Sequence, residues 1–244
     1  MHQDEFVSLF NGSGPNVKEP ENVLTGLPKV NSTDLVDWTG VYTTPVKNQE
    51  QCGSCWAFSA TEQFESDVMR VLSTTYELSP QQIVSCDTRS AGCRGGNTET
   101  AYAYIKKFGG QEEESAYPYT SHAGVSHRCE DDVSKVVATQ DGFTTVRGED
   151  NMASYVTSTG PLSICVDAST WNSYTGGVMK VCGKQIDHCV QAVGVLPDET
   201  TGYWKVRNSW ATDWGEDGFI RLAFGKDTCG LTNDPTYLKN PTLV

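Results

Sequence analysis

The chain has 244 residues and a formal net charge of −13, from 31 acidic and 18 basic side chains. This length gives one large domain or two small ones and is enough to bury a hydrophobic core. The acidic balance argues against broad binding to nucleic acid or to an anionic membrane. Hydrophobic residues make up 37% of the chain. No apolar run approaches the about 20 residues of a membrane span, so we expect a soluble globular protein.

Residues 1–30 differ from the rest of the chain. They are rich in Gly, Pro, Asn and Ser and lack hydrophobic periodicity, so we expect an extended, protease-sensitive linker that does not pack into a core. Asn11 and Asn31 each begin an N-glycosylation sequon, although such triplets also occur by chance. The first residues lack the basic and apolar regions of a signal peptide, so none is expected there.

Helical periodicity follows Cys55. Ala60, Phe64, Val68 and Leu72 recur at every fourth position. This spacing predicts a helix of about 17 residues with one buried face and with Cys55 at its N-terminal end.

Two further helices are expected in the first half. Ser79 is a favourable N-cap, Pro80 suits the first turn, and Gln82 occupies the capping-box position. The next helix begins after Asn97 and ends at Gly109-Gly110.

The second half changes to short segments rich in β-branched and aromatic residues. They span 161–168, 189–196, 203–210 and 218–224 and are separated by turn sequences, which predicts a mainly antiparallel sheet. Helices followed by strands indicate an α+β protein of two lobes. The cleft between two lobes is a natural place for a substrate.

Nine cysteines are many for a cytosolic chain of this size. A disulfide framework with one thiol left over fits a secreted or lysosomal protein. Cys52 and Cys55 form a C-x-x-C motif, which suits a redox pair, half of a zinc site or a nucleophile. The chain lacks the second ligand pair that zinc needs. The helix after Cys55 favours the nucleophile, because a helix N-terminus stabilises a thiolate.

A cysteine nucleophile needs a base, and the chain has four histidines. His2 lies in the irregular start, and His122 and His127 lie in a polar loop. His188 stands at the edge of a predicted strand, which makes it the best candidate for the base. Asn208 ends a later strand, where its amide could accept a hydrogen bond from the imidazole.

Taken together, these motifs resemble those of papain-family cysteine proteases of the cathepsin L-like kind. The stretch from Cys52 to Trp56 reads CGSCW and matches the C-G-[SA]-C-[WY] signature. His188 and Asn208 follow Cys55 by 133 and 153 positions, close to the separations known for the family. Further matches are TPVKNQ at 44–49, GCRGG at 92–96, YPY at 117–119, VG at 193–194 and NSWATDWGEDGF at 208–219.

The resemblance covers the chain from Asp34 onward and implies a two-lobed papain-like fold. It implies a helical lobe over about 40–145 and an antiparallel, barrel-like β lobe over about 146–244 together with the first mature residues. The active site would lie in the cleft between the lobes. Residues 1–30 resemble the end of a propeptide and its linker, and 31–244 the catalytic domain, which implies a truncated zymogen with its mature start near 27–34.

The family pattern also implies catalytic roles. Cys55 would be the nucleophile, His188 the base, and Asn208 the group that orients His188, with Trp210 shielding that hydrogen bond. Gln49 would join the backbone N–H of Cys55 in an oxyanion hole. The thiolate of such a pair titrates at about 3–4, so activity is expected from mildly acidic to near-neutral pH.

The resemblance implies the disulfides Cys52–Cys93, Cys86–Cys129 and Cys182–Cys229. Cys165 and Cys189 are then left over, and we expect two small buried thiols in preference to a fourth disulfide. The implied substrate-binding residues are Gly95, Gly96, Asn97, Thr98, Cys165, Ile186, Asp187, Cys189, Trp210 and Asp234.

Asp234 would form the floor of the pocket for the residue before the scissile one. There it would either pair with an arginine of the substrate or face solvent without a role. The small and medium walls of this pocket suit aliphatic and aromatic side chains.

The function implied is a cysteine endopeptidase that forms a thioester acyl-enzyme. The stretch between Cys93 and Cys129 has no insertion that would block the cleft as in a dipeptidase. No cofactor or metal is expected. Expected partners are protein and peptide substrates and inhibitors of cystatin type, for a monomer in a lysosome or vacuole or outside the cell. The alternatives are a catalytically dead relative and a redox or metal-binding protein.

Overall fold

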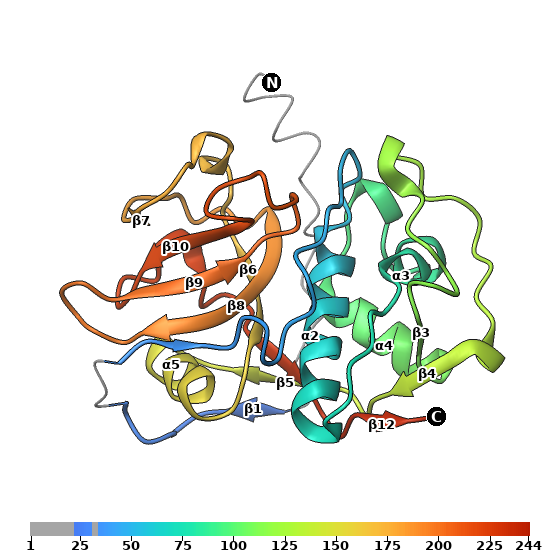
Figure 1. Ribbon diagram of the computed structural model, residues 1–244, viewed down its shortest axis with the longest axis horizontal. Helices are drawn as coiled ribbons and strands as arrows, with labels where there is room; N and C mark the ends of the chain where they lie inside the picture. Colours follow the sequence, from blue (N-terminus) through green and yellow to red (C-terminus); the bar gives the residue numbers. More distant parts are fainter. Residues whose placement is uncertain (1–21, 31–33) are drawn as a thin grey trace.

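The computed structural model describes residues 22–30 and 34–244. Two lobes lie side by side, and α2 runs along the boundary between them (Figure 1). The described helices are α2 (Cys55–Leu72), α3 (Pro80–Cys86), α4 (Thr98–Phe108) and α5 (Glu149–Ser158), with short 3₁₀ turns at Gly92–Arg94, Ser121–Ala123, Val133–Lys135, Trp171–Ser173 and Thr228–Gly230. The described strands are β1 (Val23–Leu24), β2 (Val36–Asp37), β3 (Gln111–Glu112), β4 (Val136–Thr139), β5 (Phe143–Val146), β6 (Leu162–Val166), β7 (Val178–Met179), β8 (His188–Leu196), β9 (Tyr203–Arg207), β10 (Phe219–Ala223), β11 (Thr236–Leu238) and β12 (Thr242–Leu243). This arrangement confirms the two-lobed α+β fold.

The helical lobe packs α2, α3 and α4 around one hydrophobic cluster that includes Phe58 and Phe64. The predicted caps of α3 and α4 are present. Ser79 Oγ accepts the N–H of Gln82 at 3.1 Å, and Asn97 Oδ1 caps the first turn of α4. The second half of the capping box does not form, because Gln82 Oε1 accepts a hydrogen bond from the N–H of Glu112.

The β lobe contains a sheet in the order β1-β5-β11-β6-β8-β9-β10-β7, with β2 also paired to β8. Its central pairs are antiparallel, whereas the edge pairs β1–β5 and β10–β7 are parallel. Among the described residues no pairing closes the sheet, so it is an open sheet and not a barrel. Strand β6 places Cys165 opposite Cys189 of β8, and Val166 opposite His188.

The second half also contains a helix that the strand patterns did not predict. Helix α5 runs from Glu149 to Ser158 and buries Met152, Tyr155 and Val156 in the core of the β lobe. Its sequence, EDNMASYVTS, mixes β-branched and small polar residues, so its helical propensity is weak. Burial of its apolar side chains against the sheet explains its stability.

Residues 22–30 lie on the β lobe. Strand β1 pairs with β5, and Leu24 and Leu27 pack against the core of this lobe. Asn151 Oδ1 accepts the N–H of Leu27 at 2.9 Å. The expectation that no residue before Asp34 packs into a core is therefore wrong for 22–30. Both predicted sequons, at Asn11 and Asn31, fall outside the described residues.

Several contacts join the lobes across α2. Ser59 Oγ donates to the carbonyl of Val190 on β8 at 2.7 Å. Strand β12, at the end of the chain, pairs with β4 beside the helices. Within 22–30 and 34–244, no helix has both the length and the apolar character needed to cross a bilayer.

The described residues contain four disulfides. The three pairings implied by the family resemblance are present, and Cys55 is a free thiol. The fourth disulfide joins Cys165 to Cys189, so the expectation of two free thiols there is wrong. Neighbouring antiparallel strands bring these two residues opposite one another, with their Cα atoms 4.0 Å apart.

Candidate active site

Cys55 is the first residue of α2 and is fully buried. The Cys52–Cys93 disulfide ties the loop before the helix to the rest of the lobe. The N–H of Gly53 also donates to the carbonyl of Cys93 at 2.9 Å. Backbone N–H groups of Cys55 itself, of Trp56 and of Cys189 face the thiol. These donors, together with the helix N-terminus, favour negative charge on the sulfur.

His188 is the first residue of β8 and is also fully buried. Pairing with Val166 of β6 positions its backbone, and the N–H of Asp187 donates to the carbonyl of Val166 at 3.0 Å. The next residue on the strand, Cys189, has its N–H close to the Cys55 thiol. The structure therefore brings the starts of α2 and β8 together where the lobes meet.

Asn208 follows β9 and settles the tautomer of His188. Asn208 Oδ1 accepts the N–H of Ser209 at 2.8 Å, which identifies that atom as the amide oxygen. The same oxygen lies 2.8 Å from Nε2 of His188, so Nε2 must carry a proton. In the neutral imidazole, Nδ1 is then the proton acceptor. This Nδ1 is buried and has no hydrogen-bond partner.

Tryptophan rings surround the imidazole. The Trp210 ring lies 4.8 Å from His188, and the Trp171 ring 5.9 Å away and nearly perpendicular. Trp214 stacks on Trp171 and meets the edge of Trp210. Such a shell keeps water from the His188–Asn208 hydrogen bond, which strengthens it. The motif predicted a role for Trp210, whereas only the fold reveals Trp171 and Trp214.

Gln49 is held in a fixed orientation. Ser209 Oγ donates to its Oε1 at 2.7 Å, and its Nε2 donates to the carbonyl of Cys52 at 2.9 Å. The backbone N–H of Gln49 donates to the carbonyl of Ser209. An amide nitrogen has two protons, so one N–H of Gln49 is left for an anion beside the first turn of α2.

Burial shifts both titratable groups toward their neutral forms. It raises the pKa of the Cys55 thiol to about 12. It also lowers the pKa of His188 to about 4, against the opposing effect of the Asn208 hydrogen bond. The direction for Cys55 is opposite to the low thiolate pKa expected from the motif, because the fully covered thiol is removed from water.

The glycines and the cap residues of the proposed substrate site have clear structural roles. A Cβ on Gly96 would lie 2.3 Å from the Trp56 indole, and Gly95 has a positive φ of 116°. Asn97 caps α4 through its side chain, and Thr98 is buried in the first turn. These roles account for the residue types independently of any substrate.

The remaining predicted residues belong to the β lobe. Cys165 and Cys189 form the disulfide described above. Asp234 lies two residues before Thr236, the residue of β11 that pairs with Ser163 of β6. Asp187 Oδ1 accepts the N–H of Ala168 at 2.8 Å, and Ile186 lies beside Gly230.

Asp234 does not face open solvent. Its side chain is buried, and its Oδ2 has no hydrogen-bond partner. Burial raises the pKa of Asp234 to about 6. Burial and the charge of Asp234 together raise the pKa of Glu99, in the first turn of α4, to about 7. Nothing in the sequence alone singles out Glu99. A glutamate in the first turn of a helix is common, because its charge interacts favourably with the helix dipole.

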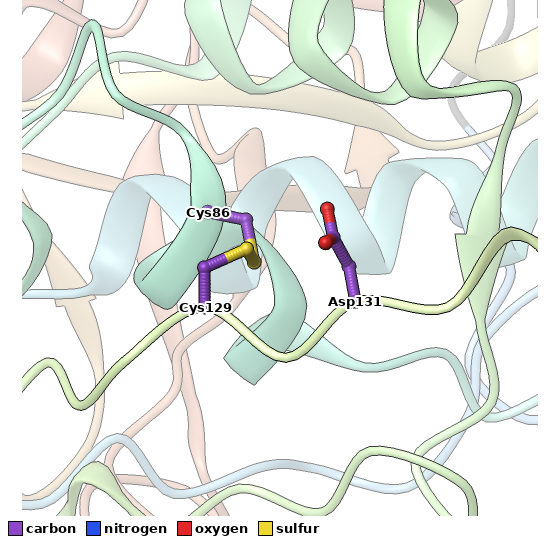
Figure 2. Close-up of side chains that lie close together, drawn as sticks. All are labelled: Cys86, Cys129 and Asp131. Atoms are coloured by element: carbon purple, nitrogen blue, oxygen red, sulfur yellow. A yellow bond between two sulfur atoms is a disulfide. The ribbon is translucent and has the colours of Figure 1, made fainter.

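One group of side chains has metal-ligand types in close proximity, namely Cys86, Cys129 and Asp131. Figure 2 shows that the two sulfurs are joined in a disulfide beside the aspartate. Bonded sulfurs do not provide the thiolates that metal ions require. Asp131 Oδ2 accepts the hydroxyl proton of Tyr104 at 2.8 Å. The group is a structural cross-link.

Comparisons with known proteins place this geometry in a family. The sequence model described as papain family cysteine protease matches residues 31–239. Cysteine proteinase 1 of Dictyostelium discoideum is 41% identical over 216 residues, which are 81% of this chain and 62% of that protein. Cathepsin L 2 of Paramecium tetraurelia is 41% identical over 245 residues, which are 97% of this chain and 74% of that protein.

A solved structure agrees with these matches. Digestive procathepsin L 3 of the Tenebrio molitor larval midgut matches with a TM-score of 0.86 at 29% identity, over 98% of this chain and 80% of that one. The chain spans 62% and 63% of the length of the relatives from Dictyostelium discoideum and Leishmania mexicana. The matched residues include those that hold the buried thiol and imidazole, and the chain belongs to the papain family of cysteine proteases.

Proposed function

We propose that this protein is a cysteine endopeptidase in which Cys55 attacks the peptide bond and His188 transfers the protons. The observation that carries the proposal is the tautomer of His188. Nε2 donates to Asn208 Oδ1, which leaves the unpartnered Nδ1 as the proton acceptor. A thiol at a helix N-terminus beside an oriented imidazole is the arrangement that activates a cysteine nucleophile.

The proposed reaction proceeds in two stages. The thiol proton moves from Cys55 to Nδ1 of His188, and the thiolate adds to the scissile carbonyl carbon. The tetrahedral intermediate collapses to a thioester as His188 returns the proton to the leaving amine. Water then attacks the thioester with His188 as base, and the carboxylic acid leaves with restoration of the thiol.

The developing oxyanion would bind the backbone N–H of Cys55 and the remaining N–H of Gln49. The hydrogen bond from Ser209 to Gln49 Oε1 holds this donor in place before the substrate binds. Donors that are oriented in advance stabilise the transition state without reorganisation.

The pKa shifts of Cys55 and His188 both favour the neutral side chains, as expected for a resting site that is covered from solvent. Burial disfavours an isolated thiolate or imidazolium, whereas transfer of one proton creates both charges side by side, where each stabilises the other. We infer that a substrate reaches Cys55 only after the covered site opens. In this proposal, residues 1–30 are the end of a propeptide, and their removal is needed for full activity.

We also propose that the pocket for the residue before the scissile bond accepts basic side chains. Buried Asp234 has an unpartnered oxygen, and its charge acts on Glu99 nearby. A guanidinium or ammonium group would satisfy both carboxylates. Because their raised pKa values are about 6 and about 7, this preference should strengthen from pH 5 to pH 7.

Two assays test the function. Hydrolysis of a peptide library is measured before and after removal of residues 1–30, with and without an irreversible thiol-directed inhibitor, and the modified residue is identified by mass spectrometry. We expect internal cleavage, inhibitor attached to Cys55, and faster modification after removal. Absence of hydrolysis with an accessible, modified Cys55 would identify a dead relative instead.

The specificity assay compares substrates with Arg and Leu at the second position before the cleavage site. Asp234→Asn and Glu99→Gln should each reduce the Arg/Leu ratio of kcat/KM, while Glu77→Gln serves as a charge control. An unchanged ratio in both variants would refute the acidic pocket.

The proposed setting is an acidic lysosomal or vacuolar compartment, or the extracellular space, with protein and peptide substrates.

A further inference from the structure

His188 and Cys189, which in the proposed mechanism act on the Cys55 thiol from the β lobe, lie at a structural transition. Residues 181–187 have no regular secondary structure, and β8 begins at His188. The first residues of a strand are prone to fraying unless other contacts fix them. The base therefore occupies a position where backbone pairing alone provides little constraint.

Two disulfides bracket this segment. Cys182 is bonded to Cys229 before it, and Cys189 is bonded to Cys165 immediately after His188. The Cys165–Cys189 bond links the second residue of β8 to β6, directly beside the Val166–His188 pair. Both cysteines are buried, with exposed fractions of 3% and 1%.

The Cys165–Cys189 bond does not belong to the hydrophobic core of the β lobe. That core contains Ile164 and Val190, the alternate residues of the same strands. Side chains two residues from the disulfide face α2 instead: Ser163 contacts Ser59, and Gln191 Nε2 donates to Ser66 Oγ at 2.9 Å. Because side chains alternate along a strand, the disulfide faces α2 and the nucleophile.

The backbone of Cys189 takes part in the active centre. Its N–H faces the Cys55 thiol, where it favours the thiolate. The imidazole of His188 and the N–H of Cys189 come from consecutive residues, so one displacement of the strand start moves both. A displacement of about 1 Å can cost about 100-fold in rate.

We propose that the Cys165–Cys189 disulfide is a positioning element of the catalytic centre, which holds the His188 imidazole and the Cys189 N–H together against the Cys55 thiol. The proposal rests on the proposed endopeptidase function. It assigns to the disulfide a role in aligning reacting groups that differs from general stabilisation of the fold. The disulfide itself takes no part in bond making or breaking.

The test compares two double variants. Cys165→Ala/Cys189→Ala removes the proposed positioning bond, and Cys86→Ala/Cys129→Ala removes a disulfide of the helical lobe (Figure 2). For each, after removal of residues 1–30, the rate of Cys55 alkylation by iodoacetamide is measured against pH, along with kcat, KM and the melting temperature. Alkylation reports the state of the thiol without requiring substrate turnover.

We expect the first variant to lose about tenfold in kcat, with the alkylation profile displaced by about one pH unit toward higher pH, as loss of an aligned donor and base predicts. The control should keep the wild-type alkylation profile even if its melting temperature falls. An unchanged profile and kcat in Cys165→Ala/Cys189→Ala, or equal displacement in the control, would overturn the proposal.

A second measurement applies if the first variant does not fold. Wild-type protein is treated with graded phosphine and its activity is assayed, while a separate sample is alkylated and mass spectrometry measures the fraction of chains in which only Cys165 and Cys189 are open. Full activity in that population would overturn the proposal, whereas loss of activity in step with opening supports it. Activity in a Cys55→Ala protein would instead refute the proposed cysteine mechanism, so the two failures are distinguishable.

Discussion

The two lobes hold their parts of the active centre in different ways. Cys55 is placed by the helix that it begins and by the preceding loop, which the Cys52–Cys93 disulfide ties to a segment 41 residues away. His188 is placed by pairing with β6 and by Asn208, which is 20 residues away along the chain.

This comparison separates reactivity from alignment. In the proposed mechanism, the helical lobe supplies the sulfur and the N–H groups of Cys55 and Trp56, so changes there remove an atom that reacts or a group that stabilises its charge. The β lobe supplies the proposed base, the proposed orienting group and the strands beneath them. Changes to these supporting groups should misplace the base without removing it, and their effects should be smaller.

The largest effect is expected at the nucleophile. Cys55→Ala should reduce kcat by about 10⁶-fold, as loss of a nucleophile does in other proteases, while circular dichroism and melting temperature stay close to wild type. His188→Ala should be nearly as damaging because it removes the proposed acceptor of the thiol proton. Turnover of Cys55→Ala within tenfold of wild type would contradict the assignment of the nucleophile.

The next effect concerns the oxyanion donor. Gln49→Ala should lower kcat by about 10²- to 10³-fold with little change in KM, because the lost hydrogen bond forms in the transition state. Ser209→Ala is the matched control, since it frees Gln49 Oε1 but leaves the donor. If both variants lose equally little, Gln49 does not bind the oxyanion.

A smaller effect is expected at the orienting amide. Asn208→Ala should lower kcat by about 10- to 100-fold, because His188 remains present but loses the partner that fixes its ring. The pH dependence of kcat/KM should also change, since the hydrogen bond raises the pKa of His188. An unaltered pH profile would show that the fold holds the imidazole without Asn208.

The smallest effect is a gradual loss of stability as pH rises. Burial raises the pKa of Glu62 to about 7, so the folded protein retains a proton that the unfolded chain releases above about 4.5. The same sign holds for Glu99, Asp187 and Asp234, whereas His188, with a lowered pKa, opposes it between about 4 and 6.5. The melting temperature should therefore fall from pH 4.5 to pH 7.

Glu62 provides a specific variant for this stability test, because its side chain on α2 pairs with a residue of the β lobe. Its Oε2 lies 3.5 Å from Nε of Arg207, the residue before Asn208. Glu62→Gln resembles the protonated side chain, so the variant should match wild type near pH 5 and lose less stability by pH 7. A wild-type melting temperature that rises steadily over this range would contradict the sign.

Local sequence was enough to predict helices α2, α3 and α4 and the place of Cys55 at the start of α2. Ser79 and Asn97 act as N-caps as predicted, because capping depends on residues within one turn. The four strand segments of the second half also appear where predicted. Helix α5 was missed, because its stability comes from burial of Met152 and Tyr155 against a distant sheet.

The sequence by itself determined which residue types are available for catalysis and in what order they occur, because the motif around Cys55 and the positions of His188 and Asn208 are properties of the chain. Tertiary structure decided the pairing of Cys165 with Cys189, the tryptophan shell of His188, and the proximity of Glu99 to Asp234. These features depend on strand register and on the meeting of two lobes. Residues brought together in this way are separated along the chain, and no local pattern records their distance in space.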